Sequence, residues 1–432
     1  MNALPPARSF ETKQPKWPRL RDVMGPGLIT GASDDDPSGI ATYSQAGAQF
    51  GYSLGWTLLL TYPLMVAIQL ISAQIGRVTG RGLAGNMRRH YPAPLLYLLV
   101  GLLVVANTIN LGADLGAMAA ALHLLIDGPM LIYVAGFAII TVLAEVFIRY
   151  SRYASVLRWL TLSLFAYVAT VFVVGVPWLT VARDLVLPNI SPSGNYLTVV
   201  VAVFGTTISP YLFFWQAGEE VEDEKEDREA KPLIQAPQQA PRQMARMQLD
   251  TLVGMGFSNI IALFIMLTTA ATLNAHGVTD IETSSQAAEA LRPIAGQFAF
   301  TIFALGIIGT GLLAVPVLAG SAAYAVGEAL HWRVGLAQRP GRARAFYGVV
   351  AAATLVGAVL NFTPLDPIKA LFWSAVINGV AAVPIMVMIM LMASRRVVMG
   401  QFTLTRWLTG LGWLATAVMA MAAVGMFATW GN

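Results

Sequence analysis

Three consecutive carboxylates, Asp34, Asp35 and Asp36, stand before Pro37 in a stretch that is otherwise small and apolar. An ionised carboxylate at the middle of a bilayer costs about 2.5 to 3.5 kcal/mol, so an acid in a hydrophobic segment is a candidate functional group. Proline donates no N–H and disfavours helix at the preceding residue, which predicts a helix break at Asp36. Broken helix persists inside a membrane only where protein or a water-filled cavity satisfies the backbone. We therefore expect Asp36 to hold a cation in such a cavity.

Asp36 has a simpler interpretation as the cap of a helix whose first residue is Pro37. In that case the acids would lie at the water interface. The stretch after Pro37 ends at Gly51 and is too short and too polar to span a membrane alone. The cost of a lipid-facing acid favours the broken helix.

The composition places these acids in a membrane protein. The chain has 432 residues, of which 56% are hydrophobic and 12% charged, unlike a soluble globular domain. Cysteine is absent, which excludes disulfides, thiolate metal sites and a cysteine nucleophile. Residues 1–21 are polar and lack the apolar core of a secretory signal, so we expect a cytoplasmic tail.

Runs of about 20 apolar residues predict an all-α polytopic fold with eleven transmembrane helices. Five spans would make a first repeat over 22–180 and five a second repeat over 196–392, with an additional span at 405–430. The candidate spans are 24–48, 52–77, 94–122, 130–149, 154–178, 196–217, 250–273, 298–326, 345–361, 368–392 and 407–429.

The sixth span is also interrupted, by Ser209 and Pro210. Interrupted helices at corresponding positions of two halves are typical of inverted-repeat transporters. Unpaired carbonyls and helix C-terminal ends at such breaks attract cations. Thr206, just before the break, can offer a hydroxyl or carbonyl, although threonine commonly bonds its own helix backbone.

The basic residues predict the orientation. With the N-terminus inside, all of the 27 Lys and Arg residues except Arg183, Arg292 and Lys369 fall in inner segments. We therefore expect a cytoplasmic N-terminus and an external C-terminus in the cell membrane. The excess of basic residues is explained by their position on this inner face, so no nucleic-acid partner is expected. The polar segment 218–249 is rich in charge, Pro and Gln, which predicts a mobile cytoplasmic linker whose acids Glu219 and Glu220 are solvated.

The stretches "DDDPSG" and "TTISPY", with "IIGTGLLAVPVLAG" in the eighth span, resemble the Nramp family of divalent-metal transporters. The resemblance covers nearly the whole chain. It implies a LeuT-like inverted repeat of five plus five spans with discontinuous first and sixth helices. It also implies that Asp36 and the backbone of Ser33 bind the transported metal. In this fold Asn378 of the tenth span would face the same cavity, although asparagine is as often a contact between membrane helices. Asn110 of the third span carries the same ambiguity.

The departures from the family are equally informative. Gly39 replaces the motif Asn, Ser209 the sixth-span Met, Tyr211 the His and Ala375 the tenth-span Gln. Thioether and imidazole suit transition metals, whereas carboxylate, carbonyl, hydroxyl and water suit magnesium, calcium and manganese. The pattern is similar to that of the Nramp-related magnesium transporters, and we expect Mg²⁺ with Mn²⁺ as a second substrate.

Asp114 in the third span matches the proton-pathway aspartate of the family, but Ala117 occupies the place of the neighbouring glutamate. Tyr211, with a reference pKa near 10, is a poor proton carrier at cellular pH. We therefore expect transport without proton coupling, and retain Asp114 and Tyr211 as coupling-pathway candidates.

Other functions remain open from the sequence. One alternative is a proton-coupled Mn²⁺ or Fe²⁺ transporter, and another is a LeuT-like symporter of a small organic cation or amino acid. An enzyme is not expected, because the sequence has no His-rich metal cluster, nucleophile elbow or phosphate loop. No cofactor is expected beside the transported ion and the lipid bilayer.

Overall fold

The computed structural model describes residues 30–31, 33–148, 159–188, 190–191, 193–227, 229–363 and 366–430. The secondary structure of these residues is helical without any strand, as the all-α prediction requires. The predicted tail and the starts of the predicted first and fifth spans lie outside the described residues.

Eight helices of the described part of the chain are long and apolar enough to cross a membrane, or nine if a pair bent by 115° counts as one span. The bent pair comprises α8 (Phe165–Val173) and α9 (Trp178–Val186). The eight are α3 (Gly55–Thr79), α5 (Ala93–His123), α6 (Met130–Phe147), α10 (Gly194–Thr207) continued by α11 (Pro210–Glu226), α12 (Ala240–Thr272), α15 (Ala299–Ala329), α17 (Pro367–Ser394) and α19 (Arg406–Ala428).

The predicted number of eleven spans is not confirmed over the described residues. The ninth predicted span corresponds to α16 (Arg344–Leu360), which has 17 residues and is short for a crossing. The described part of the first span comprises helical residues before the break (30–31 and 33–34) and α2 (Pro37–Phe50), with 14 residues, after it.

Both predicted helix breaks are present. Asp36 is extended at φ −69°, ψ 169°, and Pro37 begins α2. Ser209 is likewise extended at φ −80°, ψ 132°, and Pro210 begins α11. Proline is favoured at the first helical position, where a missing N–H leaves no hydrogen bond unmade.

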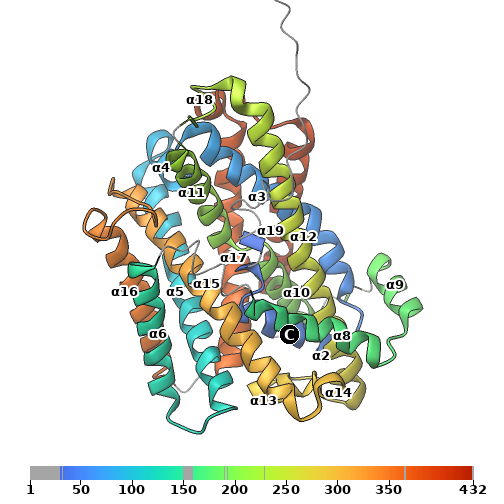
Figure 1. Cartoon of the computed structure of the whole chain (residues 1–432). Helices are drawn as coiled ribbons and strands as arrows, with labels where there is room; N and C mark the ends of the chain where they lie inside the picture. Colours follow the sequence, from blue (N-terminus) through green and yellow to red (C-terminus); the bar gives the residue numbers. More distant parts are fainter. Residues whose placement is uncertain are drawn as a thin grey trace, which may run out of the picture.

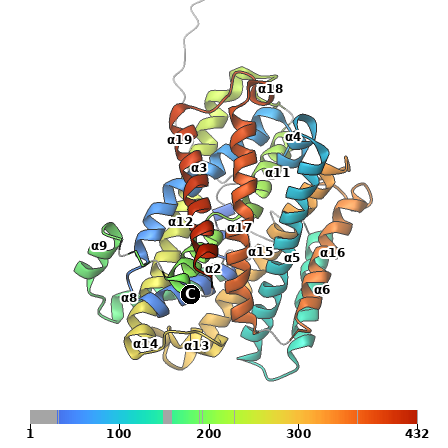
Figure 2. The same cartoon turned by 180° about the vertical axis from the view of Figure 1, so that it is seen from behind.

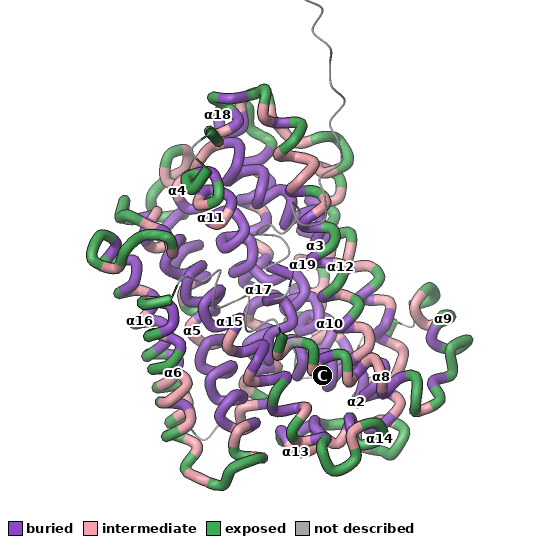
Figure 3. The backbone as a smooth tube through the Cα atoms, in the orientation of Figure 1, coloured by how far each residue is buried: buried purple, intermediate pink, exposed green. Residues whose placement is uncertain are grey.

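The broken helices lie in the interior of the bundle. Helix α2 packs against α12, α17 and α10, and α10 packs against α17. The most apolar window of α10 with α11 is 89% buried, whereas those of α6 and α19 are 33% buried. Figure 3 shows this contrast between buried inner and exposed outer helices. Short helices close the ends: α4 (Leu83–His90) and α18 (Arg396–Met399) lie at one end, α13 (Ser284–Glu289) and α14 (Arg292–Ala295) at the other (Figures 1 and 2).

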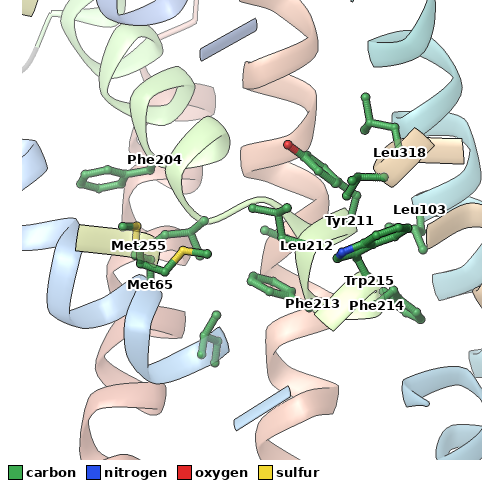
Figure 4. Close-up of a cluster of buried hydrophobic side chains, with 14 of the residues drawn as sticks. Met65, Leu103, Phe204, Tyr211, Leu212, Phe213, Phe214, Trp215, Met255 and Leu318 are labelled. Atoms are coloured by element: carbon green, nitrogen blue, oxygen red, sulfur yellow. The ribbon is translucent and has the colours of Figure 1, made fainter. Parts of the chain in front are cut away.

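An aromatic run fixes the start of α11. Tyr211, Phe213, Phe214 and Trp215 are all buried in a hydrophobic cluster (Figure 4). A β-carbon at Gly320 of α15 would lie 2.7 Å from the Trp215 ring, so this contact requires glycine. The packing holds Tyr211 in place beside the helix break.

The segment 218–249, expected to be a mobile linker with solvated acids, is largely helical. Helix α11 continues to Glu226 and α12 begins at Ala240. Glu220 is fully buried and forms an ion pair with Arg246 at 2.6 Å. The linker prediction was wrong for these parts, because the charges are spaced so that acids of α11 meet basic residues of the neighbouring helices.

Candidate cation site

Asp36 both caps a helix and is buried. Its Oδ1 accepts hydrogen bonds from Gly39 N at 2.6 Å and Ser38 Oγ at 2.7 Å, and the residue is 1% exposed. The capping geometry of the simpler interpretation is therefore present, but inside the protein. These two donors fix the carboxylate plane, as expected for an N-cap.

The second oxygen of Asp36 meets two other helices. Its Oδ2 accepts from Asn110 Nδ2 of α5 at 3.2 Å and from Tyr211 OH of α11 at 3.3 Å. Tyr211 OH also lies 3.3 Å from the Ser33 carbonyl oxygen. A phenol has one hydrogen, so Tyr211 serves only one of these acceptors at a time. Asp36 Oδ2 is thus the less firmly held oxygen of this carboxylate.

Asn110 is in contact with Ser374 of α17, whose Oγ lies 2.5 Å from Asn110 Oδ1 and 2.7 Å from Leu371 O of its own helix. The shorter contact is the one to Asn110, so we take the single hydroxyl hydrogen to be donated there. With its carbonyl oxygen engaged, the amide presents its N–H₂ group to Asp36. The chain of contacts Ser374, Asn110, Asp36 therefore connects α17, α5 and the start of α2.

Ser209 and Thr206 behave differently at the α10–α11 break. Ser209 Oγ lies 2.6 Å from Gly205 O and 2.9 Å from Thr206 O, so it bonds carbonyls of its own helix. Thr206 Oγ1 is buried without a hydrogen-bond partner in the described part of the chain. A β-carbon at Gly39 would lie 3.2 Å from Thr206 Oγ1 and 3.4 Å from Asp36 Oδ1. Thr206 therefore lies across Gly39 from Asp36, and the space between them depends on glycine.

Asn378 is 1% exposed, and neither its Oδ1 nor its Nδ2 has a partner among the described residues. It follows Ser374 by four positions on α17, so the two side chains share a face. Helix α17 is in close contact with the end of α10, since a β-carbon at Gly205 would lie 2.0 Å from Ala375 O. A buried unpaired amide on this face can accept a ligand such as a cation or ordered water.

Asp114 lies one turn beyond Asn110 on α5 and is completely buried. Neither of its oxygens has a hydrogen-bond partner within the described residues, and it lies near Asp36 and the Ser38 backbone. An ionised carboxylate in such a place is stable only beside a cation.

Asp34 and Asp35 point away from this group of contacts. Both contact Ser258 Oγ of α12, at 2.7 Å from Asp34 Oδ2 and 3.1 Å from Asp35 Oδ1. The three consecutive acids therefore contact different helices: Asp34 and Asp35 contact α12, and Asp36 is the one directed at α5 and α11. Over the described residues there is no cluster of three or more His, Cys, Asp or Glu arranged to hold a metal.

Residues 27–429 match the family described as natural resistance-associated macrophage protein-like, Nramp. This chain belongs to the Nramp family. It is 27% identical over 407 residues to the divalent metal cation transporter MntH of Klebsiella pneumoniae subsp. pneumoniae, covering 92% of this chain and 91% of the relative. It is 26% identical over 327 residues to MntH of Yersinia pestis, covering 72% and 74%.

Two solved structures resemble this Nramp protein in fold. One is a manganese transporter from Eremococcus coleocola, with TM-score 0.72, 18% identity and coverage of 99% of this chain and 89% of the other. The second is Mhp1, a nucleobase-cation-symport-1 family transporter in a closed conformation, with TM-score 0.54, 13% identity and coverage of 94% and 93%. These likenesses agree with the expected LeuT-like arrangement.

The Nramp fold brings several of the predicted site residues together. Asp36, Ser33 and Tyr211 are in contact, and Thr206 lies beside Asp36 across Gly39. Ser209 is at the break but turns to its own helix, and Asn378 and Asp114 are buried nearby without partners among the described residues. Sequence reasoning did not find Ser374 and Ser258, because an isolated serine in an apolar helix carries no pattern.

Proposed function

We propose that this Nramp protein transports divalent cations across the cell membrane, with Mg²⁺ as its main substrate and Mn²⁺ as a second one. The MntH relatives are divalent metal cation transporters rather than enzymes, and the Eremococcus neighbour is a manganese transporter. The observation that carries the choice of Mg²⁺ is the presence of Ser209 and Tyr211 at the α10–α11 break, in the positions where the family has Met and His. Hydroxyl oxygens suit hard cations, whereas thioether and imidazole suit transition metals.

The carboxylate geometry supports a partly hydrated ion. Asp36 Oδ1 is held by two short bonds, whereas Oδ2 has two longer bonds that an incoming cation can replace. Mg²⁺ usually keeps several waters and uses one or two carboxylates. Asp36 Oδ2 would bind the ion, while Asn110, Tyr211, Thr206 and the other neutral groups around it would bind its waters or the ion itself.

We further propose that transport is not coupled to protons. A divalent ion entering a negative-inside cell gains about 4.6 kcal/mol per 100 mV, twice the value for a single charge. Tyr211 and Ala117 stand where the family has imidazole and carboxylate, so Asp114 lacks two of the relay groups of the family. The end that carries α4 and α18 would face the cytoplasm, with the N-terminus inside and the C-terminus outside.

The test is Mg²⁺ uptake into proteoliposomes containing a Mg²⁺-sensitive dye, with the membrane potential set by a K⁺ gradient. Asp36→Asn keeps the size of the side chain and removes its charge, so uptake should fall to the level of empty liposomes. Asp127→Asn is the matched control, because Asp127 is exposed and outside the site. Equal uptake by Asp36→Asn and the parent would refute the assignment of the site.

The alternatives give different results in the same vesicles. Mn²⁺ or Fe²⁺ that competes with Mg²⁺ at a hundredfold lower concentration, with acidification of the lumen, would identify a proton-coupled transition-metal transporter. Uptake of an amino acid in place of Mg²⁺ would identify a symporter of organic substrates.

A further inference from the structure

Helix α4 and the C-terminal end of α11 lie at the same end of the molecule (Figure 1). The residues there line a pocket of about 360 Å³. It lies outside the group of contacts around Asp36, and its lining comes from elements far apart in the sequence. We call it the basic pocket and define it by Arg81, Arg88, Arg89, Lys225, His331 and Trp332.

The cations of this pocket are not used in ion pairs. In the part of the chain that the structure describes, none of its Arg or Lys side chains forms a salt bridge. The positive charge of Lys225 is partly offset by the nearby acids of α11 and by Glu328. The arginines Arg81, Arg88 and Arg89 retain their charge for an external partner.

Glu328, the acid that lines the pocket, already accepts hydrogen bonds from the backbone. Glu328 of α15 accepts the backbone N–H groups of Gly82 and Gly85, each at 2.9 Å. Its carboxylate therefore binds the start of α4 rather than the neighbouring arginines. The unpaired charge of the basic pocket is consequently positive.

His90, at the end of α4, reports the same positive field. Burial lowers the pKa of its imidazole, and the charges of Arg89, Arg81 and Arg395 lower it further. A cationic imidazole is therefore disfavoured at the end of α4, beside the arginines of the pocket.

His331 adds an unusual backbone conformation. It follows α15 with φ +61°, and the next N–H, that of Trp332, bonds Gly327 O at 2.7 Å. Glycine is the usual residue at such a helix end, because other side chains are disfavoured in the left-handed region. The sequence has an imidazole where glycine would be easier to accommodate, and this side chain lines the pocket.

We propose that the basic pocket binds the phosphate group of an anionic ligand. Arginine binds phosphate oxygens through two parallel N–H groups, and Lys225 and His331 supply further donors. Trp332, partly exposed, gives the pocket an apolar wall for an acyl chain or a base. The shared chemistry is the phosphate, and its source is either an anionic phospholipid of the adjoining leaflet or a free nucleotide.

Binding here would connect parts of the two predicted repeats. Arg81, Arg88 and Arg89 belong to the first, whereas Lys225 and His331 belong to the second. A phosphate held by both sets would hold α4 against the ends of α11 and α15. This inference does not depend on which cation the protein transports.

The test uses the full-length protein in a neutral detergent, with thermal unfolding followed during titration by one probe at a time. The probes are short-chain phosphatidylglycerol, ATP without metal, and zwitterionic short-chain phosphatidylcholine. We expect phosphatidylglycerol or ATP to raise the Tm in a saturable manner, and phosphatidylcholine to leave it unchanged. A response to phosphatidylglycerol alone identifies a lipid site, and a response to ATP identifies a site for free phosphates.

The variant Arg88→Gln/Arg89→Gln should weaken the apparent affinity of the active probe at least about tenfold, since each basic residue contributes roughly fivefold near an anionic surface. Arg339→Gln/Arg342→Gln removes the same charge from exposed residues outside the pocket and should change the affinity less than about twofold. His331→Gly should fold at least as stably as the parent and still bind the probe more weakly. No Tm shift with either anionic probe, or equal weakening by both double variants, would overturn the proposal.

Discussion

The hydroxyl of Tyr211 lies 3.3 Å from Oδ2 of Asp36 and so joins the start of α11 to the start of α2. The resemblance to the family places a His at the position of Tyr211, so a titratable ring there would adjoin the carboxylate that we propose binds the metal. The substitution removes a group that changes charge near neutral pH and keeps an oxygen in its place.

The first prediction is that Tyr211→His makes Mg²⁺ uptake depend on pH. A protonated imidazole beside Asp36 repels the incoming cation, so uptake should fall at least about tenfold as the pH is lowered from 8 to 5.5. Tyr211→Phe keeps the packing of the aromatic cluster without a titratable group, and its profile over the same range should be flat. The measurement is initial uptake in proteoliposomes at fixed potential, and matching profiles for the two variants would rule out the contact in the transport cycle.

The second prediction concerns Ser374, which orients Asn110 toward Asp36. Ser374→Ala frees the amide to rotate, and loss of such an orienting contact costs roughly 10- to 100-fold in metal affinity. We therefore expect the KM for Mg²⁺ to rise by about this factor with little change in the Tm. Ser374→Thr keeps the hydroxyl and should restore most of the affinity. If Ala and Thr variants behave alike, the hydroxyl does not orient the site.

The sequence was sufficient for the main features of the fold because hydrophobic runs and prolines act locally. Pro37 and Pro210 each prevent continuation of the helix before them, and both breaks are where the prolines place them. The predicted number of spans is not confirmed, since the predicted span 345–361 is a 17-residue helix and the fifth span bends sharply after Val173.

The network around the site was less accessible from the sequence. Ser374 contacts Asn110, and Ser258 contacts Asp34 and Asp35, across helices distant in the chain. A lone serine is compatible with any face of an apolar helix, so only the packed structure selects its partner. The acids of α11 were wrongly predicted to be solvated. Glu220 forms an ion pair with Arg246 of another helix, and the sequence alone does not show that pairing.

The third prediction is a change in metal preference. Ser209→Met places a thioether at the α10–α11 break and removes a hydroxyl that bonds Gly205 O and Thr206 O. A soft ligand favours transition metals, so Mn²⁺ and Cd²⁺ should compete with Mg²⁺ at least about tenfold more effectively. Ser209→Ala controls for the lost hydroxyl and should leave the order of preference unchanged. An unaltered competition profile in Ser209→Met would mean that this side chain does not face the ion.

The fourth prediction concerns stability at the end that carries α4. Arg246→Met leaves the buried carboxylate of Glu220 without its closest partner, and breaking such a pair costs about 3 to 5 kcal/mol. The Tm should fall clearly in detergent. Arg246→Met/Glu220→Gln removes both charges and should recover most of the loss, because no uncompensated charge stays buried. A double variant as unstable as the single one would show that Arg246 contributes packing rather than charge.

The last prediction tests the proposed absence of proton coupling. Asp114 is a buried carboxylate near Asp36, with neither oxygen paired among the described residues, and we propose it as the acid that a proton pathway would use. Proteoliposomes containing a pH dye, with an inward Mg²⁺ gradient and a clamped potential, should take up Mg²⁺ without acidifying, and the rate should follow the voltage. Tyr211→His/Ala117→Glu restores the two relay groups of the family and should couple acidification to metal entry. Stoichiometric acidification by the unmodified protein that disappears in Asp114→Asn would show a coupled transporter instead, because only a proton pathway through Asp114 links those two results.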